Sequence, residues 1–346
     1  MANREKRDDS AYVRLKKDLA ANQLGRLYIL HGEETYLRDF YLGRMKEQLL
    51  AGGMADFNLH IIPEQEFTPA VLEQTVDHLP MMSQRTVIQI TDYDIFKAGE
   101  QDRQALTELF AQLPDYCCVI FVYDLIGYKA DARTKLAVAI RENGQVVEFA
   151  RQEQSDLVDW VHRRFRALGK EIDSELARYL IFQCGDLMTG LISEIEKIGA
   201  FAKGSRITKQ DIDAVATPQL DAVTYEMTNA IGAGDFDTAA SILGELLQMQ
   251  EPAVKIVYSL GKHLRQLYAA RLAMEHHQTA GDLMAQWDIK PYPARKLMDS
   301  ARRFSLVWCR KAVIRCARTD LALKSGGNER ELLCALLLDL ATPEKK

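Results

Sequence analysis

The sequence lacks the features of secreted, membrane-spanning and metal-binding proteins. The charged stretch at residues 1–10 does not resemble a signal peptide, and no apolar run approaches the roughly 20 residues of a membrane helix. The six cysteines form no CxxC pair and show no regular spacing, so we expect reduced, buried thiols in a cytoplasmic protein. Neighbouring Cys117 and Cys118 point to opposite faces of an expected strand and cannot easily share one metal ion. These absences predict no membrane contact, no metal and no cofactor.

Patterns of common catalytic sites are also missing. The chain has no Gly-x-Ser-x-Gly elbow and no His-Glu-x-x-His zinc helix. His276 and His277 are adjacent at an expected helix end, so their side chains diverge by about 100° and suit a shared metal poorly. We therefore expect no catalytic residue, and we expect the function to lie in binding surfaces.

A missing phosphate loop is the most informative absence. The apolar run Leu27–Leu30 is followed by the turn His31–Tyr36 and then by a helical pattern. ATP phosphates bind at this strand–turn–helix in many α/β proteins, through several glycines, a lysine and a Ser/Thr. Here the turn has one glycine, Gly32, and two carboxylates, Glu33 and Glu34, which would repel phosphate. We interpret these carboxylates as residues favoured at a helix start rather than as a metal or acid–base pair.

What is present fits a soluble protein of two or three domains, with 346 residues, 47% hydrophobic and 27% charged. In residues 1–151 short apolar runs alternate with helical patterns, which predicts a parallel α/β sheet. The expected strands are Leu27–Leu30, Phe57–Ile62, Arg85–Thr91, Cys117–Tyr123 and Gln145–Phe149. The expected helices are Ala11–Ala21, Glu34–Leu50, Thr68–His78, about Gln101–Gln112 and about Asp131–Arg141.

Beyond this region the strands stop. The hydrophobic pattern predicts four short helices in residues 152–216 and longer helices in residues 217–346. We expect a boundary between the two regions at Thr217-Pro218. Residues suited to capping helix starts are Ser155, Asp173, Thr208, Asp235, Ser305 and Asn328. Glycines suited to helix ends are Gly169, Gly185, Gly199 and Gly326-Gly327.

The net charge of −5 is unevenly distributed along the chain. Between Lys290 and Arg330 there are 11 basic and 3 acidic residues, a local charge of +8 that leaves −13 on the rest. A basic surface on an acidic protein predicts a polyanion site, whereas solvated helix faces or subunit contacts would give the same count.

An α/β domain followed by a small four-helix domain is the general layout of AAA+ ATPases. Such an enzyme needs a phosphate loop and an acidic residue at a strand end to hold Mg²⁺. The strand Val119–Tyr123 is followed by a single carboxylate, Asp124, which we interpret as a turn residue. The sequence therefore predicts an AAA+-like domain that does not hydrolyse ATP.

The pair Met81-Met82 lies at an element junction and has two interpretations. Methionines there can fill the core, or they can form a flexible apolar knob for a pocket of a partner. Residue chemistry alone favours the core.

Three segments together resemble the delta-subunit family of the bacterial DNA polymerase III clamp loader. They are Gly25–Leu37, Leu79–Arg85 and Asp320–Gly327, and the match in order and spacing spans essentially the whole chain. The resemblance implies an α/β plus all-α fold in three domains. These are an AAA+-like domain without a phosphate loop in residues 1–151, a helical lid in residues 152–216 and a C-terminal helical collar in residues 217–346.

The resemblance also implies a role in DNA replication. A delta subunit binds the ring-shaped sliding clamp (beta) and holds one of its interfaces open for loading onto primed DNA. The implied clamp-binding residues are Leu79, Pro80, Met81 and Met82, which reverses the preference for a buried methionine pair. Relatives often have a bulkier residue in this pair. Gamma/tau and delta-prime type subunits would pack against the collar, and the implied DNA-binding residues are Lys311, Arg315, Arg318 and Lys324.

Three other functions remain open at this point. The chain could be an NTPase with a divergent phosphate site. It could be a delta-prime type subunit, although that type usually offers an arginine beside Ser and Cys, and no Ser-Arg-Cys occurs here. It could also be a free-standing nucleic-acid adaptor that uses its basic C-terminal region.

Overall fold

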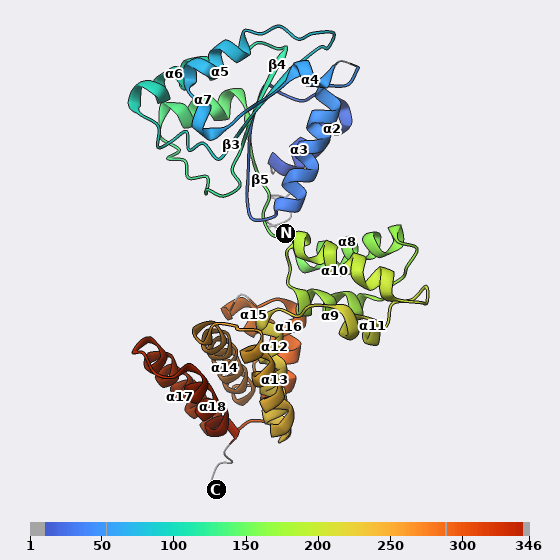
Figure 1. The fold of residues 1–346 in the computed structure, drawn as a ribbon, viewed down its shortest axis with the longest axis vertical. Coiled ribbons are helices and arrows are strands. Elements are labelled where there is room, and N and C mark those ends of the chain that lie inside the picture. Colours follow the sequence, from blue (N-terminus) through green and yellow to red (C-terminus); the bar gives the residue numbers. More distant parts are fainter. Residues whose placement is uncertain (1–10, 53, 288, 342–346) are drawn as a thin grey trace. The chain divides into compact units, whose positions relative to one another are not determined.

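The computed structural model describes residues 11–52, 54–287 and 289–341, which form two compact units (Figure 1). The first unit extends to Gln152 and includes the short segment Leu187–Thr189. The second unit holds Glu153–Asp186 and the chain from Gly190 onward. The further division of the helical part into a lid and a collar at residue 217 stays a prediction.

A five-stranded parallel sheet forms the centre of the first unit, with strand order β2-β3-β4-β1-β5. The strands are β1 (Leu27–His31), β2 (Leu59–Ile62), β3 (Thr86–Thr91), β4 (Cys117–Val122) and β5 (Gln145–Glu148). β4 is buried along its whole length because helices cover both faces of the sheet. Figure 1 shows α2 and α3 on one side and α5, α6 and α7 on the other.

The helices of the first unit largely follow the expected pattern. They are α2 (Ala11–Ala21), α3 (Thr35–Leu49), α4 (Ala55–Asn58), α5 (Pro69–Val76), α6 (Glu100–Ala111) and α7 (Lys135–Asn143), with a 3₁₀ turn at Glu64–Glu66. The expected start of a helix at Asp131 is wrong. Asp131 instead accepts a hydrogen bond from the backbone of Arg133, and Thr134 caps α7 by accepting from the Ala137 backbone.

The expected start of the second strand at Phe57 is also wrong. Residues Ala55–Asn58 form the single helical turn α4, and β2 begins only at Leu59. The Asn58 side chain closes this turn, because its Nδ2 donates to the carbonyl oxygen of Met54 at 2.9 Å.

Apart from one isolated β-bridge between Glu171 and Arg206, the second unit consists of helices within the residues that the structure describes. They are α8 (Gln154–Ala167), α9 (Ser174–Cys184), α10 (Met188–Phe201), α11 (Lys209–Val215), α12 (Leu220–Ala233), α13 (Phe236–Gln248), α14 (Ala253–Glu275), α15 (Ala280–Trp287), α16 (Pro291–Ala301), α17 (Leu306–Lys324) and α18 (Glu329–Ala341). The first two residues of α10 group with the first unit.

Most expected helix caps of the second unit are confirmed. The capping side chains accept backbone hydrogen bonds at Asp173, Thr208, Asp235, Ser305 and Asn328. Ser155 is not a cap, because α8 already begins at Gln154. Gly199 does not end its helix, since α10 continues to Phe201. A Cβ at Gly199 would lie 2.7 Å from Leu168 Cδ1, so this glycine permits close packing.

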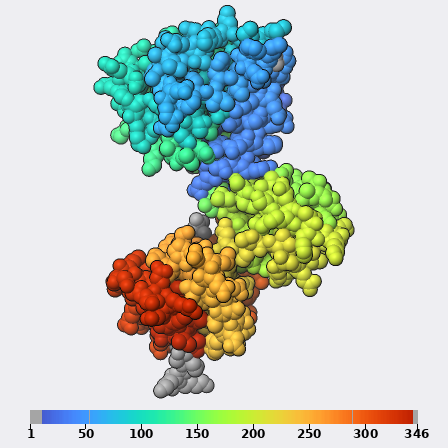
Figure 2. Space-filling view, in the orientation of Figure 1, coloured from blue at the N-terminus to red at the C-terminus, as the bar shows by residue number. Residues whose placement is uncertain are grey.

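One hydrophobic core joins the C-terminal helices α12–α18. In Figure 2 the red surface of α17 and α18 lies against the orange surface of the helices that precede them. α14 and α17 approach closely at Gly261, where a Cβ would lie 3.1 Å from Cys316 Sγ.

Five of the six cysteines are buried free thiols, and Cys334, which we expected to be buried, is exposed. No helix within the described ranges is long and apolar enough to cross a membrane.

Candidate partner-binding surface

The turn after β1 is closed by groups of the protein itself. Gly32 has φ +125°, and a Cβ there would lie 2.4 Å from the carbonyl oxygen of Phe149. That same carbonyl oxygen accepts a hydrogen bond from the backbone N–H of Glu34 at 2.9 Å. In phosphate loops such N–H groups face the phosphates. The backbone at this corner therefore binds the end of β5 instead.

Both carboxylates of the turn have partners within the first unit. Glu34 is fully buried, and its Oε2 accepts a hydrogen bond from the backbone N–H of Met188 at 3.2 Å. Glu33 is exposed and lies 2.5 Å from Nε of Arg151. A phosphate in this corner would meet the Glu33 carboxylate where a phosphate loop offers a lysine, which opposes binding.

The carboxylate after β4 also has a structural partner. Arg38 on α3 is buried, and its Nη2 donates to Asp124 Oδ1 at 2.7 Å. Its Nη1 donates to the carbonyl oxygen of Tyr123 at 3.1 Å. Asp124 thus lies in the turn after β4 and fixes α3 to this end of the sheet.

The loop between α5 and β3 exposes an apolar surface, which we call the knob and define as Leu79, Pro80, Met81 and Met82. Leu79, Met81 and Met82 are 71%, 56% and 79% exposed. The preference for a buried methionine pair, drawn from residue chemistry alone, is therefore wrong. Exposed apolar side chains grouped in one loop are typical of a contact site for a partner.

A buried amide holds the backbone of the knob. Asn58 is 1% exposed, and its Oδ1 accepts from the Met81 backbone N–H at 2.7 Å. Its Nδ2 donates to the Met81 carbonyl oxygen at 2.8 Å. Both backbone polar groups of Met81 are thus bound to one side chain, so the methionine side chain extends from a fixed point.

The C-terminal end of the loop is fixed separately. Nη1 of Arg85 donates to the carbonyl oxygens of Leu24 and Gly25 at 2.7 and 2.9 Å. Met82 adopts φ +50°, a left-handed conformation that is unusual for a methionine. Unfavourable backbone conformations of this kind concentrate at functional sites.

Sequence reasoning missed Asn58. Its amide bonds to residue 81, which is 23 positions away, so no local pattern reveals the interaction. The only signal is an asparagine directly before the apolar run Leu59–Ile62, and this signal is weak.

The four candidate DNA-binding side chains on α17 differ in their surroundings. Lys311 and Arg318 are exposed. The guanidinium of Arg315 donates to the Asp339 carbonyl oxygen, and its Nε lies 3.8 Å from the Asp339 carboxylate. Lys324 Nζ lies 2.7 Å from Asp320 Oδ2. Two of the four cations are thus partly neutralised by acidic neighbours.

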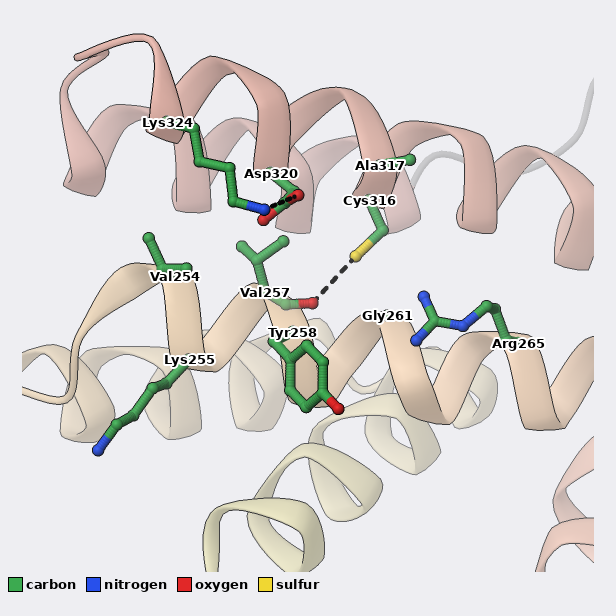
Figure 3. A pocket seen from close by; sticks show the side chains of 10 residues that line it. All are labelled: Val254, Lys255, Val257, Tyr258, Gly261, Arg265, Cys316, Ala317, Asp320 and Lys324. Atoms are coloured by element: carbon green, nitrogen blue, oxygen red, sulfur yellow. Dashed lines mark hydrogen bonds and ion pairs between the residues drawn. The ribbon is translucent and has the colours of Figure 1, made fainter. Parts of the chain in front are cut away.

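A groove of about 320 Å³ lies between α14 and α17 (Figure 3). Figure 3 shows Lys324 turned toward Asp320, and Lys255 directed away from α17. Arg265 extends over Gly261 toward Cys316, whose Sγ donates to the Val257 carbonyl oxygen at 3.3 Å. The groove thus carries cations without forming a single basic patch.

Comparisons with known proteins give a consistent result for both units. Residues 28–150 match the family model for "DNA polymerase III, delta subunit", and residues 221–339 match the model for its C-terminal domain. The chain is similar to "DNA polymerase III subunit delta" of Bacillus subtilis, with 23% identity over 93% of this chain and 94% of the relative. It is also similar to "Probable DNA polymerase III subunit delta" of Aquifex aeolicus, with 22% identity over 77% and 76% of the two chains.

A solved structure supports the same fold. The structure of the Bacillus subtilis DNA clamp loader delta protein is similar to this one, with a TM-score of 0.55 and 22% sequence identity. The match covers 95% of this chain and 99% of that chain. The expected fold class, a parallel α/β domain of AAA+-like type followed by helical parts, is confirmed.

Proposed function

Because the chain belongs to the DNA polymerase III delta-subunit family, we propose that it binds the sliding clamp through the knob and holds one ring interface open. In this role it supplies binding energy and does not hydrolyse ATP itself. It acts in the cytoplasm together with other clamp-loader subunits, which pack against the C-terminal helices, and it delivers the clamp to primed DNA.

The observation that carries this proposal is an exposed apolar knob on a fixed backbone. Burial of an apolar side chain in a pocket contributes roughly 1.5–3 kcal/mol. The hydrogen bonds of Asn58 to Met81 already order the loop, so less conformational entropy is lost on binding. Met81 and Met82 are flexible beyond Cβ and can adapt to the shape of a pocket.

Ring opening follows if the knob binds one state of the clamp more tightly. A ligand shifts a two-state equilibrium only by the difference between its affinities for the two states. A knob that fits a clamp pocket better when the neighbouring interface is strained or open would raise the population of the open ring. No chemical step in this chain is needed.

The closed corner at Gly32 supports the absence of ATP hydrolysis. Glu33 and Glu34 occupy the positions where a phosphate loop provides cationic and N–H donors. Control by ATP then belongs to the partner subunits. A titration of the full chain with ATP that detects binding would favour the rival function of a divergent NTPase.

DNA contact is proposed for α17. Lys311 and Arg318 are exposed and suited to phosphate contacts. Arg315 and Lys324 remain candidates whose pairs with Asp339 and Asp320 would have to rearrange.

The central test is the double substitution Met81→Ser with Met82→Ser in the full chain. We expect clamp binding to be lost while the unfolding curve is unchanged, because both side chains are exposed. Met249→Ser is a matched control, since Met249 is 71% exposed and lies in the second unit. Unchanged clamp affinity in the double variant would remove the proposal, and an unfolded double variant would show that the pair is structural.

A further inference from the structure

Exposed apolar side chains near the knob extend beyond its four residues. Met54 and Phe57, immediately before and within α4, are 56% and 55% exposed. They are separated from the knob in sequence but connected to it through Asn58. Its Nδ2 donates to the Met54 carbonyl oxygen at 2.9 Å and to the Met81 carbonyl oxygen at 2.8 Å. One amide nitrogen therefore joins the backbones of the two segments.

Building on the proposed function, we propose that the clamp-binding surface has two parts, the knob and the α4 turn, and that Asn58 positions one relative to the other. Phe57 supplies an aromatic side chain to this surface, a residue type that is enriched at the buried centres of protein interfaces. The occupant is an apolar pocket and its rim on the sliding clamp.

The hydrogen-bond chemistry explains why asparagine is needed at position 58. Its Nδ2 uses both hydrogens, on Met54 and on Met81, and its Oδ1 accepts from the Met81 N–H. An aspartate would place a carboxylate against two carbonyl oxygens, and an alanine would leave three backbone groups without this partner. No other short side chain provides two donors and an acceptor in one plane.

Burial makes these bonds effective. Asn58 is 1% exposed, so water does not compete for its amide, and an unmade bond there would be costly. By contrast, the side chains of Phe57, Leu79, Met81 and Met82 are exposed and stabilise the free chain little. Asn58 therefore acts on the clamp contact indirectly, as a positioning residue.

The test measures clamp affinity of the full chain for Asn58→Ala and Phe57→Ser. We expect each substitution to weaken binding by about tenfold, which corresponds to about 1.4 kcal/mol. Matched controls are Asn143→Ala, which removes a bond from Asn143 Nδ2 to the Ala139 carbonyl oxygen at a helix end, and Phe201→Ser, since Phe201 is 54% exposed. Neither control should change the affinity.

Two further readouts separate positioning from a general structural effect. In Asn58→Ala the Met81 backbone amide should exchange its hydrogen faster in the free chain, because it has lost its acceptor. The effect of Asn58→Ala on affinity should also shrink when Met82→Ser is already present, since the two act on the same contact. If Asn58→Ala and Met82→Ser changed the clamp affinity additively, the role of Asn58 as a positioning residue would be contradicted.

Failure of this inference differs from failure of the proposed function. If the knob double variant loses clamp binding while Phe57→Ser and Asn58→Ala retain it, the two-part surface is wrong and the knob alone binds. If the knob double variant keeps its affinity, the proposed function itself is wrong. Should Asn58→Ala not fold, Phe57→Ser still decides whether the α4 turn takes part.

Discussion

Arg85 Nη1 lies 2.7 Å from the Leu24 carbonyl oxygen and so fixes the end of the knob loop to the segment before β1. A second bond to Gly25 strengthens this connection. Arg85→Ala should destabilise the first unit by about 1–3 kcal/mol because two backbone acceptors lose a charged donor. Hydrogen exchange of the β3 amides during urea titration measures this loss.

A control for Arg85→Ala is Arg141→Ala. Arg141 is exposed and donates to the Ala132 carbonyl oxygen at 3.0 Å. It should change stability by less than about 0.5 kcal/mol, as surface substitutions usually do. All three tryptophans, at positions 160, 287 and 308, lie in the second unit. Tryptophan fluorescence should therefore show an unchanged unfolding transition of the second unit in both variants. If Arg85→Ala and Arg141→Ala destabilised the first unit equally, the bonds of Arg85 to Leu24 and Gly25 would have no special role.

A substitution at Met82 can separate the effect of its backbone conformation from the contact of its side chain with the clamp. Its φ of +50° suits glycine better than methionine, so Met82→Gly relieves an unfavourable conformation while it makes the unfolded chain more flexible. We expect the free energy of unfolding to change by less than about 1 kcal/mol, because these effects oppose each other. Clamp affinity should fall by about tenfold or more, since the variant has no apolar side chain to bury in the clamp pocket.

Calorimetric titration with the clamp measures this change. Retained affinity in Met82→Gly would mean that Met82 does not enter the clamp pocket, and that Met81 or Leu79 carries the contact.

Phosphate contacts by α17 predict a change in salt dependence. In the assembled clamp loader, Lys311→Ala with Arg318→Ala should reduce the slope of log affinity against log salt by about 1 for each phosphate that the variant no longer neutralises. The control pair Lys203→Ala with Arg206→Ala removes the same charge from exposed residues outside the basic stretch. Binding of primed DNA across a series of salt concentrations gives the slopes. We expect the control pair to keep the slope of the unchanged protein. If the unchanged protein, the Lys311/Arg318 variant and the control all gave the same slope, Lys311 and Arg318 would be excluded from the DNA site.

The second unit should respond to acid through His263. Burial lowers the pKa of this imidazole to about 4, and Asp221 partly opposes the shift. The usual histidine pKa is about 6.5, so the unfolded chain binds a proton that the folded chain excludes between these values. This contribution to stability is fully present above about pH 6.5 and is lost as the pH falls toward 4.

His263→Gln should flatten the pH dependence of unfolding in this range. The difference in slope between the two proteins is at most about 1.4 kcal/mol per pH unit. Urea unfolding followed by tryptophan fluorescence at pH 7, 6 and 5 measures it. Parallel curves for the two proteins would mean that burial does not lower the pKa of His263, so that the folded and unfolded chains bind its proton equally.

Much of the fold could be predicted because its determinants are local or periodic. The run Cys117–Val122 is apolar at every position, as a strand covered on both faces requires. Caps such as Asp173 and Thr208 bond to backbone groups three residues away. The α4 turn was missed because Phe57 looks like part of the apolar run that follows, while a side chain closes the turn.

The candidate site depended on information that is not local. Residue chemistry placed Met81 and Met82 in the core, and only the family resemblance indicated a surface role. Their exposure follows from bonds to Asn58 and from Arg85 to Leu24, which connect distant parts of the chain. Clamp binding by these residues stays a prediction.

The close approach of Gly32 to Phe149 has a thermodynamic meaning for a clamp loader. If this corner takes no nucleotide, then the intrinsic affinity of the chain for the clamp has zero linkage to ATP concentration. The chain alone would hold the ring equally well before and after hydrolysis. Under the proposed function, release of the clamp would then come from neighbouring subunits that cover the knob, and the free energy of ATP hydrolysis would act through competition for that surface.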